Sequence, residues 1–171
     1  MNPSPHRDMA SHDRAAQLIA TLGLKPHPEG GHYREVFRSS ASVQPGDGRG
    51  ERCGLTTIYF LLNAGEQSRL HRVTSDEAWH FYEGDPLDLL WTGAEPAVVH
   101  QVRLGPVAAG MAPVAVVPAG AWQAARSSGA YTLVGCSVGP GFDFADFRML
   151  ADIPELAREL CDRNPGLRPF L

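Results

Sequence analysis

His71 and Glu77 are the two side chains of this sequence that are best suited to chemistry. They stand six positions apart in GEQSRLHRVTSDEAWHFYEG, residues 65–84, a stretch that begins and ends with glycine. An imidazole and a carboxyl group enclosed in a dry cavity can move a proton to or from a bound molecule. Burial favours the protonated carboxyl, and a neighbouring carboxylate favours the protonated imidazole. We therefore predict that His71 and Glu77 are catalytic.

Strand alternation indicates which other side chains share their surroundings. His71 and Val73 face the same side of one predicted strand, and Glu77, Trp79 and Phe81 face the same side of the next. If both strands turn these faces inward, two aromatic rings line the cavity that holds the imidazole and the carboxyl group. Trp79 and Phe81 are therefore predicted to contact a substrate by stacking.

A second segment, VVPAGAWQAARS at residues 116–127, follows about forty residues further along the chain. Together the two segments resemble the paired signatures of the cupin family, G-x5-H-x-H-x3-E-x6-G and P-x-G-x2-H-x3-N. The first signature is matched by Gly65, His71, Glu77 and Gly84. The second is matched by Pro118 and Gly120.

Two positions depart from these signatures. Val73 stands where the second histidine belongs, and Gln123 replaces the histidine of the second signature. The resemblance implies a metal site of three imidazoles and one carboxylate, of which only His71 and Glu77 remain as strong ligands. A tight transition-metal site needs three or four such ligands. We therefore expect no cofactor. A divalent metal, if one bound, would take His71, Glu77 and Gln123.

The resemblance extends beyond the signatures, from about residue 24 to residue 150. The segments HPEGGHYREVFRS, TTIYFLL and VGCSVGPGFDFADFRML are similar to one subfamily of RmlC-like cupins, whose members largely lack an assigned biochemical function. This similarity implies an all-β fold, the double-stranded β-helix jelly roll. It also implies a homodimer with a small-molecule ligand inside each barrel.

Further substrate-binding residues follow from the same comparison. Gln123 would orient a ligand by hydrogen bonding. Sugar-nucleotide epimerases of the superfamily pair a histidine base with a tyrosine acid. Here Tyr59 and Tyr33 are the candidates for the acid, and no motif selects one of them. Glu29 precedes a Gly-Gly turn and would bring a carboxylate to the entrance of the cavity.

Length and composition agree with one globular domain. The chain has 171 residues, 43% hydrophobic and 20% charged, and its net charge is −4. No Lys/Arg cluster indicates a nucleic-acid partner, and no apolar run is long enough to predict a membrane partner. Three widely spaced cysteines favour a reducing compartment, so we predict a cytoplasmic location without a signal peptide.

Glycine and proline divide the chain into short apolar runs, which is typical of an antiparallel sandwich or barrel. We predict a disordered N-terminus over residues 1–10 and a single domain over residues 11–171, with helices at Ser11–Leu22 and Pro154–Arg163. The predicted strands are Leu55–Leu62, Ser68–Val73, Ala78–Glu83, Leu87–Trp91, Val98–Arg103, Ala115–Pro118, Trp122–Ser127 and Tyr131–Ser137. Their order favours a jelly roll, and another antiparallel sandwich is the alternative.

Three functions remain open at this level. The first is a metal-independent isomerase, epimerase or lyase acting on a sugar-like or other small polar metabolite. The second is a non-catalytic ligand-binding protein that uses the same pocket. The third is a metal-dependent oxygenase with a degenerate metal site.

Overall fold

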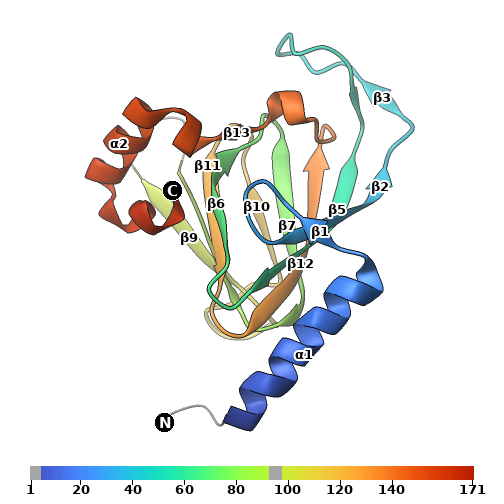
Figure 1. The fold of residues 1–171 in the computed structure, drawn as a ribbon. Helices are drawn as coiled ribbons and strands as arrows, with labels where there is room; N and C mark the ends of the chain where they lie inside the picture. Colours follow the sequence, from blue (N-terminus) through green and yellow to red (C-terminus); the bar gives the residue numbers. More distant parts are fainter. Residues whose placement is uncertain (1–4, 93–97) are drawn as a thin grey trace.

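Two antiparallel sheets face each other and form a barrel that is covered by a helix near each end of the chain (Figure 1). The computed structural model describes residues 5–92 and 98–171. The arrangement is the predicted all-β jelly roll. The first four residues of the predicted disordered N-terminus lie outside the described residues.

The larger sheet has six strands in the described part of the chain, and its order is β1-β2-β5-β12-β7-β10. The bounds of these strands are β1 Lys25–Pro26, β2 His32–Arg38, β5 Thr56–Asn63, β7 Asp76–Gly84, β10 Val114–Val117 and β12 Tyr131–Gly139.

The second sheet has the order β13-β6-β11-β8-β9. Its strands are β6 Gln67–Arg72, β8 Leu87–Thr92, β9 Val99–Leu104, β11 Trp122–Ser127 and β13 Arg148–Met149. A hairpin arm, formed by β3 (Ser42–Val43) and β4 (Arg52–Cys53), projects from the barrel at the upper right of Figure 1.

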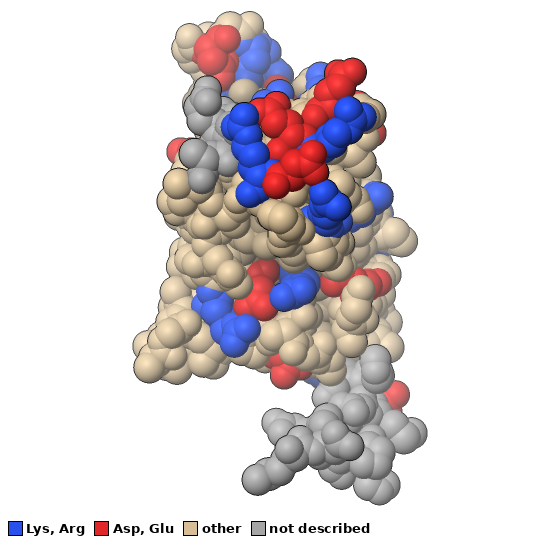
Figure 2. All heavy atoms as spheres, turned by 90° about the vertical axis from the view of Figure 1, so that its left-hand side faces the viewer, with Lys and Arg blue, Asp and Glu red and all other residues tan. Residues whose placement is uncertain are grey.

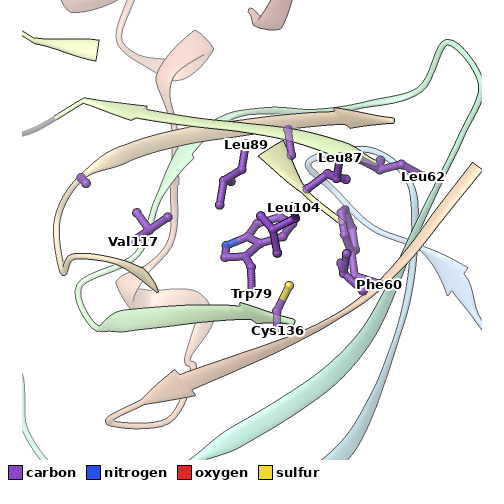
Figure 3. Packing of buried hydrophobic residues seen from close by; sticks show 11 residues of the cluster. Phe60, Leu62, Trp79, Leu87, Leu89, Leu104, Val117 and Cys136 are labelled. Atoms are coloured by element: carbon purple, nitrogen blue, oxygen red, sulfur yellow. The ribbon is translucent and has the colours of Figure 1, made fainter. Parts of the chain in front are cut away.

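The inward faces of the two sheets enclose a core around Trp79. Its buried neighbours include Phe60, Leu104, Val117 and Cys136 (Figure 3). Alternation along the strands explains this assignment, because every second residue of β5, β7 and β12 points between the sheets. One end of the barrel interior is therefore filled by side chains, and the remaining interior space lies beyond this core.

The helices bury the outer faces of the sheets. Helix α1 (Pro5–Leu22) packs Ala15 and Leu18 against Leu61 and Leu133 of the larger sheet. It begins six residues before the predicted start. Helix α2 (Pro154–Arg163) has the predicted bounds, but Ile153 is its N-cap and makes no side-chain capping bond.

Helix α2 and the 3₁₀ helices before and after it cover the second sheet, where Leu160, Leu167 and Phe170 meet Leu70 and Trp122. These helices are η2 (Leu150–Asp152) and η3 (Pro165–Phe170). Figure 2 shows this side of the molecule, on which acidic and basic side chains are intermixed rather than separated. Among the described residues, no helix has both the length and the apolar character needed to cross a membrane.

Candidate active site

A cavity of about 540 Å³ occupies the end of the barrel that the core leaves open. Its walls come from inward-facing residues of β2, β5, β6, β7 and β12 and from the segment at residues 142–147. This volume suits a small metabolite. The cavity contains both residues predicted to be catalytic, His71 and Glu77, and also Val73.

A β-bulge in β6 places His71 within this cavity. The pairing of β6 with β11 runs from His71 opposite Gln123 to Ser68 opposite Ala125, so between these pairs two residues of β6 face one of β11. The extra residue turns Ser68, instead of Arg69, to the same side as His71. His71 is only 2% exposed, and its ring stacks on Phe147 with 5.5 Å between centroids.

The same bulge fixes the tautomer of the imidazole. His71 Nδ1 lies 2.7 Å from the carbonyl oxygen of Arg69. A carbonyl oxygen only accepts, so Nδ1 carries the hydrogen and donates it. In the neutral ring, Nε2 therefore keeps a free lone pair.

A glycine turn brings Glu29 to that lone pair. Gly30 and Gly31 have φ values of 114° and 68°, which L-residues with side chains rarely adopt. A Cβ at Gly30 would collide with the carbonyl oxygen of Gln67, so only glycine lets the turn approach β6. As a result, Glu29 Oε2 lies 3.3 Å from His71 Nε2, and Oε1 accepts a 2.8 Å bond from the Ser68 hydroxyl.

Burial makes this pair neutral. Glu29 is 6% exposed, and desolvation raises its pKa to about 8, against the opposing effects of Ser68 and Arg69. Desolvation also lowers the pKa of His71, although Glu77 opposes this shift. At neutral pH the carboxyl group thus holds a proton beside an unprotonated imidazole.

His27 forms the outer side of the same cluster. Its Nδ1 lies 3.3 Å from Glu29 Oε2 and accepts a 3.3 Å bond from the Glu29 backbone N–H. Its ring meets Tyr33 edge to face, with 4.5 Å between centroids. Burial lowers the pKa of His27 to about 4, so this imidazole is also neutral at neutral pH.

Glu77 belongs to a second hydrogen-bonded chain in the wall of the cavity. Trp79 Nε1 donates to Gln123 Oε1 at 3.1 Å, and Gln123 Nε2 donates to Glu77 Oε2 at 2.6 Å. Indole N–H only donates, so it fixes which end of the amide faces Glu77. Burial raises the pKa of Glu77 and that of the adjacent Cys136 thiol.

These donors do not fit a metal ion. Gln123 turns its N–H group towards Glu77, while its oxygen is engaged by Trp79, so the amide offers no free lone pair there. Val73 lines the cavity with an apolar side chain. Within residues 5–92 and 98–171, no group of three or more His, Cys, Asp or Glu side chains is arranged to hold a metal.

The structure separates the residues that the sequence had grouped as substrate contacts. Glu29 and Tyr33 line the cavity, whereas Gln123 is fully buried behind Glu77. Trp79 shares the inward face with Glu77 as expected. It lies in the packed core, however, and does not line the cavity (Figure 3).

Phe81 and Tyr59 are also outside the cavity. Phe81 follows Trp79 along β7 and packs, partly buried, against the same core. Tyr59 points to the other side of β5, because its neighbours Ile58 and Phe60 face inward. Its ring lies edge to face with Tyr82, 6.1 Å away, so Tyr59 cannot act as the acid of this site.

Several cavity residues have no counterpart among the sequence predictions. A bulge in β2 pairs Glu35 with Ile58 and Phe37 with Thr57, which leaves Phe37 exposed and turns Arg38 to the cavity. Three phenylalanines of GFDFADF form another wall, namely Phe142, Phe144 and Phe147. The aromatic spacing of GFDFADF was the one available signal for this wall.

Comparison with known proteins places the chain in a family. The sequence profile described as Cupin superfamily (DUF985) matches residues 16–150. A hypothetical protein from Leishmania major is 37% identical, and the match covers 85% of this chain and 93% of that protein with a TM-score of 0.76. A protein from Shewanella oneidensis is 33% identical over 91% of this chain and 96% of its own length, also with a TM-score of 0.76.

More distant structures share the fold alone. Oxalate decarboxylase from Bacillus subtilis is 14% identical over 75% of this chain and 30% of that chain, with a TM-score of 0.56. No curated protein matches the chain in sequence.

Proposed function

The chain belongs to the cupin superfamily, in its DUF985 family, and from this premise we propose that it is a metal-independent isomerase or epimerase that moves a proton on a small, sugar-like metabolite. One observation carries the proposal. His71 Nε2, whose lone pair carries no hydrogen, lies 3.3 Å from the carboxyl oxygen of Glu29 in the wall of the cavity. A general base and a general acid thus stand side by side at neutral pH.

The proposed reaction starts from a metabolite with a hydroxyl group next to a carbonyl group. His71 Nε2 takes the proton from the carbon between them, and the C–H electron pair moves into the carbonyl group. The Glu29 carboxyl gives its proton to the carbonyl oxygen, which leaves a neutral enediol. Reprotonation at either carbon then yields an isomer or an epimer, and no oxidant or reductant is needed.

The remaining cavity residues support this assignment. Ser68 holds Glu29 Oε1, which leaves Oε2 as the oxygen that faces the imidazole. The sequence analysis predicted Glu77 as the partner of His71. In the structure Glu77 influences His71 electrostatically, but Gln123 occupies one of its oxygens. We therefore assign Glu77 and Gln123 to ligand orientation and Glu29 to proton transfer.

Exchange of carbon-bound hydrogen in D₂O tests the proposal without knowledge of the product. The protein is incubated with sugars, sugar phosphates and hydroxy acids, and deuterium incorporation is followed by NMR. We expect exchange with at least one compound. His71→Ala should abolish that exchange while the compound still binds, and Glu29→Gln should slow it by about 100-fold or more.

Glu83→Gln is the matched control, since Glu83 is a surface carboxylate paired with Arg14 far from the cavity. It should exchange at the wild-type rate. Unchanged exchange in His71→Ala would disprove the role of the imidazole. A compound that binds without any exchange would instead support the non-catalytic ligand-binding alternative.

A further inference from the structure

His27 lies between the cavity and a second hollow on the surface of the protein. It lines the cavity together with Glu29 and His71, and it also lines a surface groove of about 460 Å³. His27 is the only residue that these two hollows share. The groove is open to solvent, since several of its lining residues are exposed, among them Pro28, Gly65, Arg69, Pro169 and Leu171.

Two imidazole nitrogens face the same carboxyl oxygen. Glu29 Oε2 lies 3.3 Å from His71 Nε2 and 3.3 Å from His27 Nδ1. His27 Nδ1 accepts the backbone N–H of Glu29, which can only donate, so the hydrogen of this neutral ring is on Nε2. Both nitrogens therefore turn a lone pair towards Glu29 Oε2. A proton on this oxygen can pass to either ring.

The ring of His27 is held in this orientation from several sides. Its backbone N–H donates a 3.0 Å bond to the carbonyl oxygen of Gly31. The rings of Tyr33, Phe60 and Phe147 meet the imidazole edge to face, with 4.5, 6.0 and 6.1 Å between centroids. Nδ1 is thus kept beside the carboxyl group.

An imidazole can carry a proton across itself, because it accepts at one nitrogen and releases from the other. The lone pair of His27 Nδ1 is only weakly engaged, since its 3.3 Å bond is longer than the usual N–H bond of about 2.9–3.0 Å. Burial lowers the pKa of His27 to about 4. The ring therefore passes a proton on and does not keep it.

The proposed reaction needs such a route if its hydrogen is to reach solvent. His71 takes a hydrogen from the substrate carbon, yet it is only 2% exposed. Glu29 and His71 line the cavity but not the surface groove, so a substrate that fills the cavity separates them from water. Without another route, the same hydrogen would return to the substrate.

We propose that His27 relays protons between the Glu29–His71 pair and solvent at the surface groove. After Glu29 has protonated the carbonyl oxygen, its carboxylate takes the substrate-derived hydrogen from His71 Nε2. Glu29 Oε2 passes this hydrogen to His27 Nδ1, and His27 gives the hydrogen on its Nε2 to water. A proton from water returns along the same path, so the charge of the site is restored. The inference rests on the proposed function and adds the route by which its proton exchanges.

The tautomers of the two histidines test the relay without any substrate. In protein labelled with ¹⁵N histidine, long-range ¹H–¹⁵N NMR spectra at neutral pH show which ring nitrogen carries hydrogen. We expect it on Nε2 of His27 and on Nδ1 of His71. A hydrogen on His27 Nδ1 would overturn the relay, because that nitrogen would have no lone pair to receive a proton.

The fate of a substrate hydrogen tests the relay during turnover. The probes are glucose, mannose and glyceraldehyde, each deuterated at C2, which lies next to the carbonyl group. Mass spectrometry of the product formed in H₂O gives the deuterium lost for each molecule converted. We expect the wild type to lose most of the deuterium. His27→Phe keeps an aromatic ring without nitrogen, and its deuterium loss per conversion should fall about tenfold or more.

Two further variants separate a relay from a structural role. In His27→Ala, imidazole added to the buffer should restore the loss of deuterium, since it supplies the nitrogens that the side chain lacks. His100→Phe is the matched control, because His100 is exposed on β9, stacks on Trp91 and does not line the cavity. It should lose deuterium like the wild type.

Unchanged deuterium loss in His27→Phe would overturn the relay and leave the proposed reaction standing. So would the loss of all conversion in both His27 variants, which would make His27 necessary for conversion itself. If the wild type converted none of the probes, the result would count against the proposed reaction. The tautomers of His27 and His71 would then decide the relay by themselves.

Discussion

Glu29→Gln should change how the stability of the protein depends on pH. In the folded state burial raises the pKa of Glu29 from 4.5 to about 8. Between these values the folded state holds a proton that the unfolded state has lost. The free energy of unfolding therefore falls as pH rises through this window, and the contribution of Glu29 is lost once pH passes the folded pKa.

At lower pH, His27 changes the free energy of unfolding in the direction opposite to Glu29. The pKa of His27 falls from 6.5 to about 4 on folding, so between these values the unfolded state binds the extra proton and stability rises with pH. The two effects oppose each other below pH 6.5. Above pH 6.5 the contribution of His27 has levelled off. Burial also raises the pKa of Glu77, so the contribution of Glu29 is read from the difference between the wild type and Glu29→Gln.

The expected magnitude follows from the width of the remaining window. One proton changes the free energy of unfolding by about 1.4 kcal/mol per pH unit. From pH 6.5 to the folded pKa of about 8, Glu29 accounts for a loss of about 2 kcal/mol. Glutamine resembles the protonated carboxyl group but cannot titrate, so Glu29→Gln should lack this loss.

Urea unfolding followed by tryptophan fluorescence at several pH values across the window provides the measurement. Glu83→Gln is the control, because its ion pair with Arg14 lowers the pKa of Glu83 and keeps this carboxylate charged in both states. For Glu83→Gln, the plot of unfolding free energy against pH should run parallel to that of the wild type. A Glu29→Gln curve that also runs parallel to the wild type would refute the assignment of a proton to Glu29.

Three further substitutions test the parts of the fold that hold the site, each by urea unfolding. Trp79→Phe leaves the oxygen of Gln123 buried without a donor and should cost about 2–3 kcal/mol; a loss below about 1 kcal/mol would contradict this. Asp146→Asn removes the charge that pairs with Arg52 and should lower the urea midpoint, which an unchanged midpoint would exclude. Gly30→Ala strains the turn that carries Glu29 and should lower the free energy of unfolding by about 2 kcal/mol or more. A wild-type free energy of unfolding would contradict this prediction.

The strands were predictable because their ends are marked in the sequence. Trp122–Ser127 and the helix Pro154–Arg163 have the predicted bounds, and the other predicted strands differ from the structure by one or two residues at an end. Each of these runs is flanked by Gly, Pro, Asp or Ser, which interrupt regular structure locally. The identity of the fold followed from signatures that lie on three strands, β6, β7 and β11, and the turns beside them.

The faces of the strands were predicted less well than their bounds. Strict alternation pairs Arg69 with His71 and Glu35 with Phe37. A bulge in β6 and another in β2 place Ser68 and Arg38 on the cavity side instead. Bulges arise from pairing with the neighbouring strand, so no local pattern within β6 or β2 reveals them.

The partner of His71 was missed for a different reason. Glu29 belongs to a turn near the start of the chain, and it reaches His71 only because β2 lies beside β5 and the turn bends back over β6. The nearest carboxyl group in sequence, Glu77, was the natural candidate. Contacts between residues so far apart depend on how the whole chain folds, and spacing carries no information about them.

The two departures from the cupin signatures have a common consequence in the structure. At the position of the second histidine, Val73 gives the cavity an apolar wall. At the other, Gln123 supplies an N–H donor to Glu77 where a metal ligand would supply a lone pair. Trp79 fixes that orientation, because its indole N–H can only donate and therefore faces the amide oxygen. Glu77 is therefore satisfied by hydrogen bonds without a cation, and Glu29 and His71 are left as a neutral acid and base facing each other across 3.3 Å.

A metal at this site would have to displace the amide and leave the buried indole N–H without an acceptor. The orientation of this amide therefore supports the proposed reaction, in which His71 and Glu29 themselves move the proton.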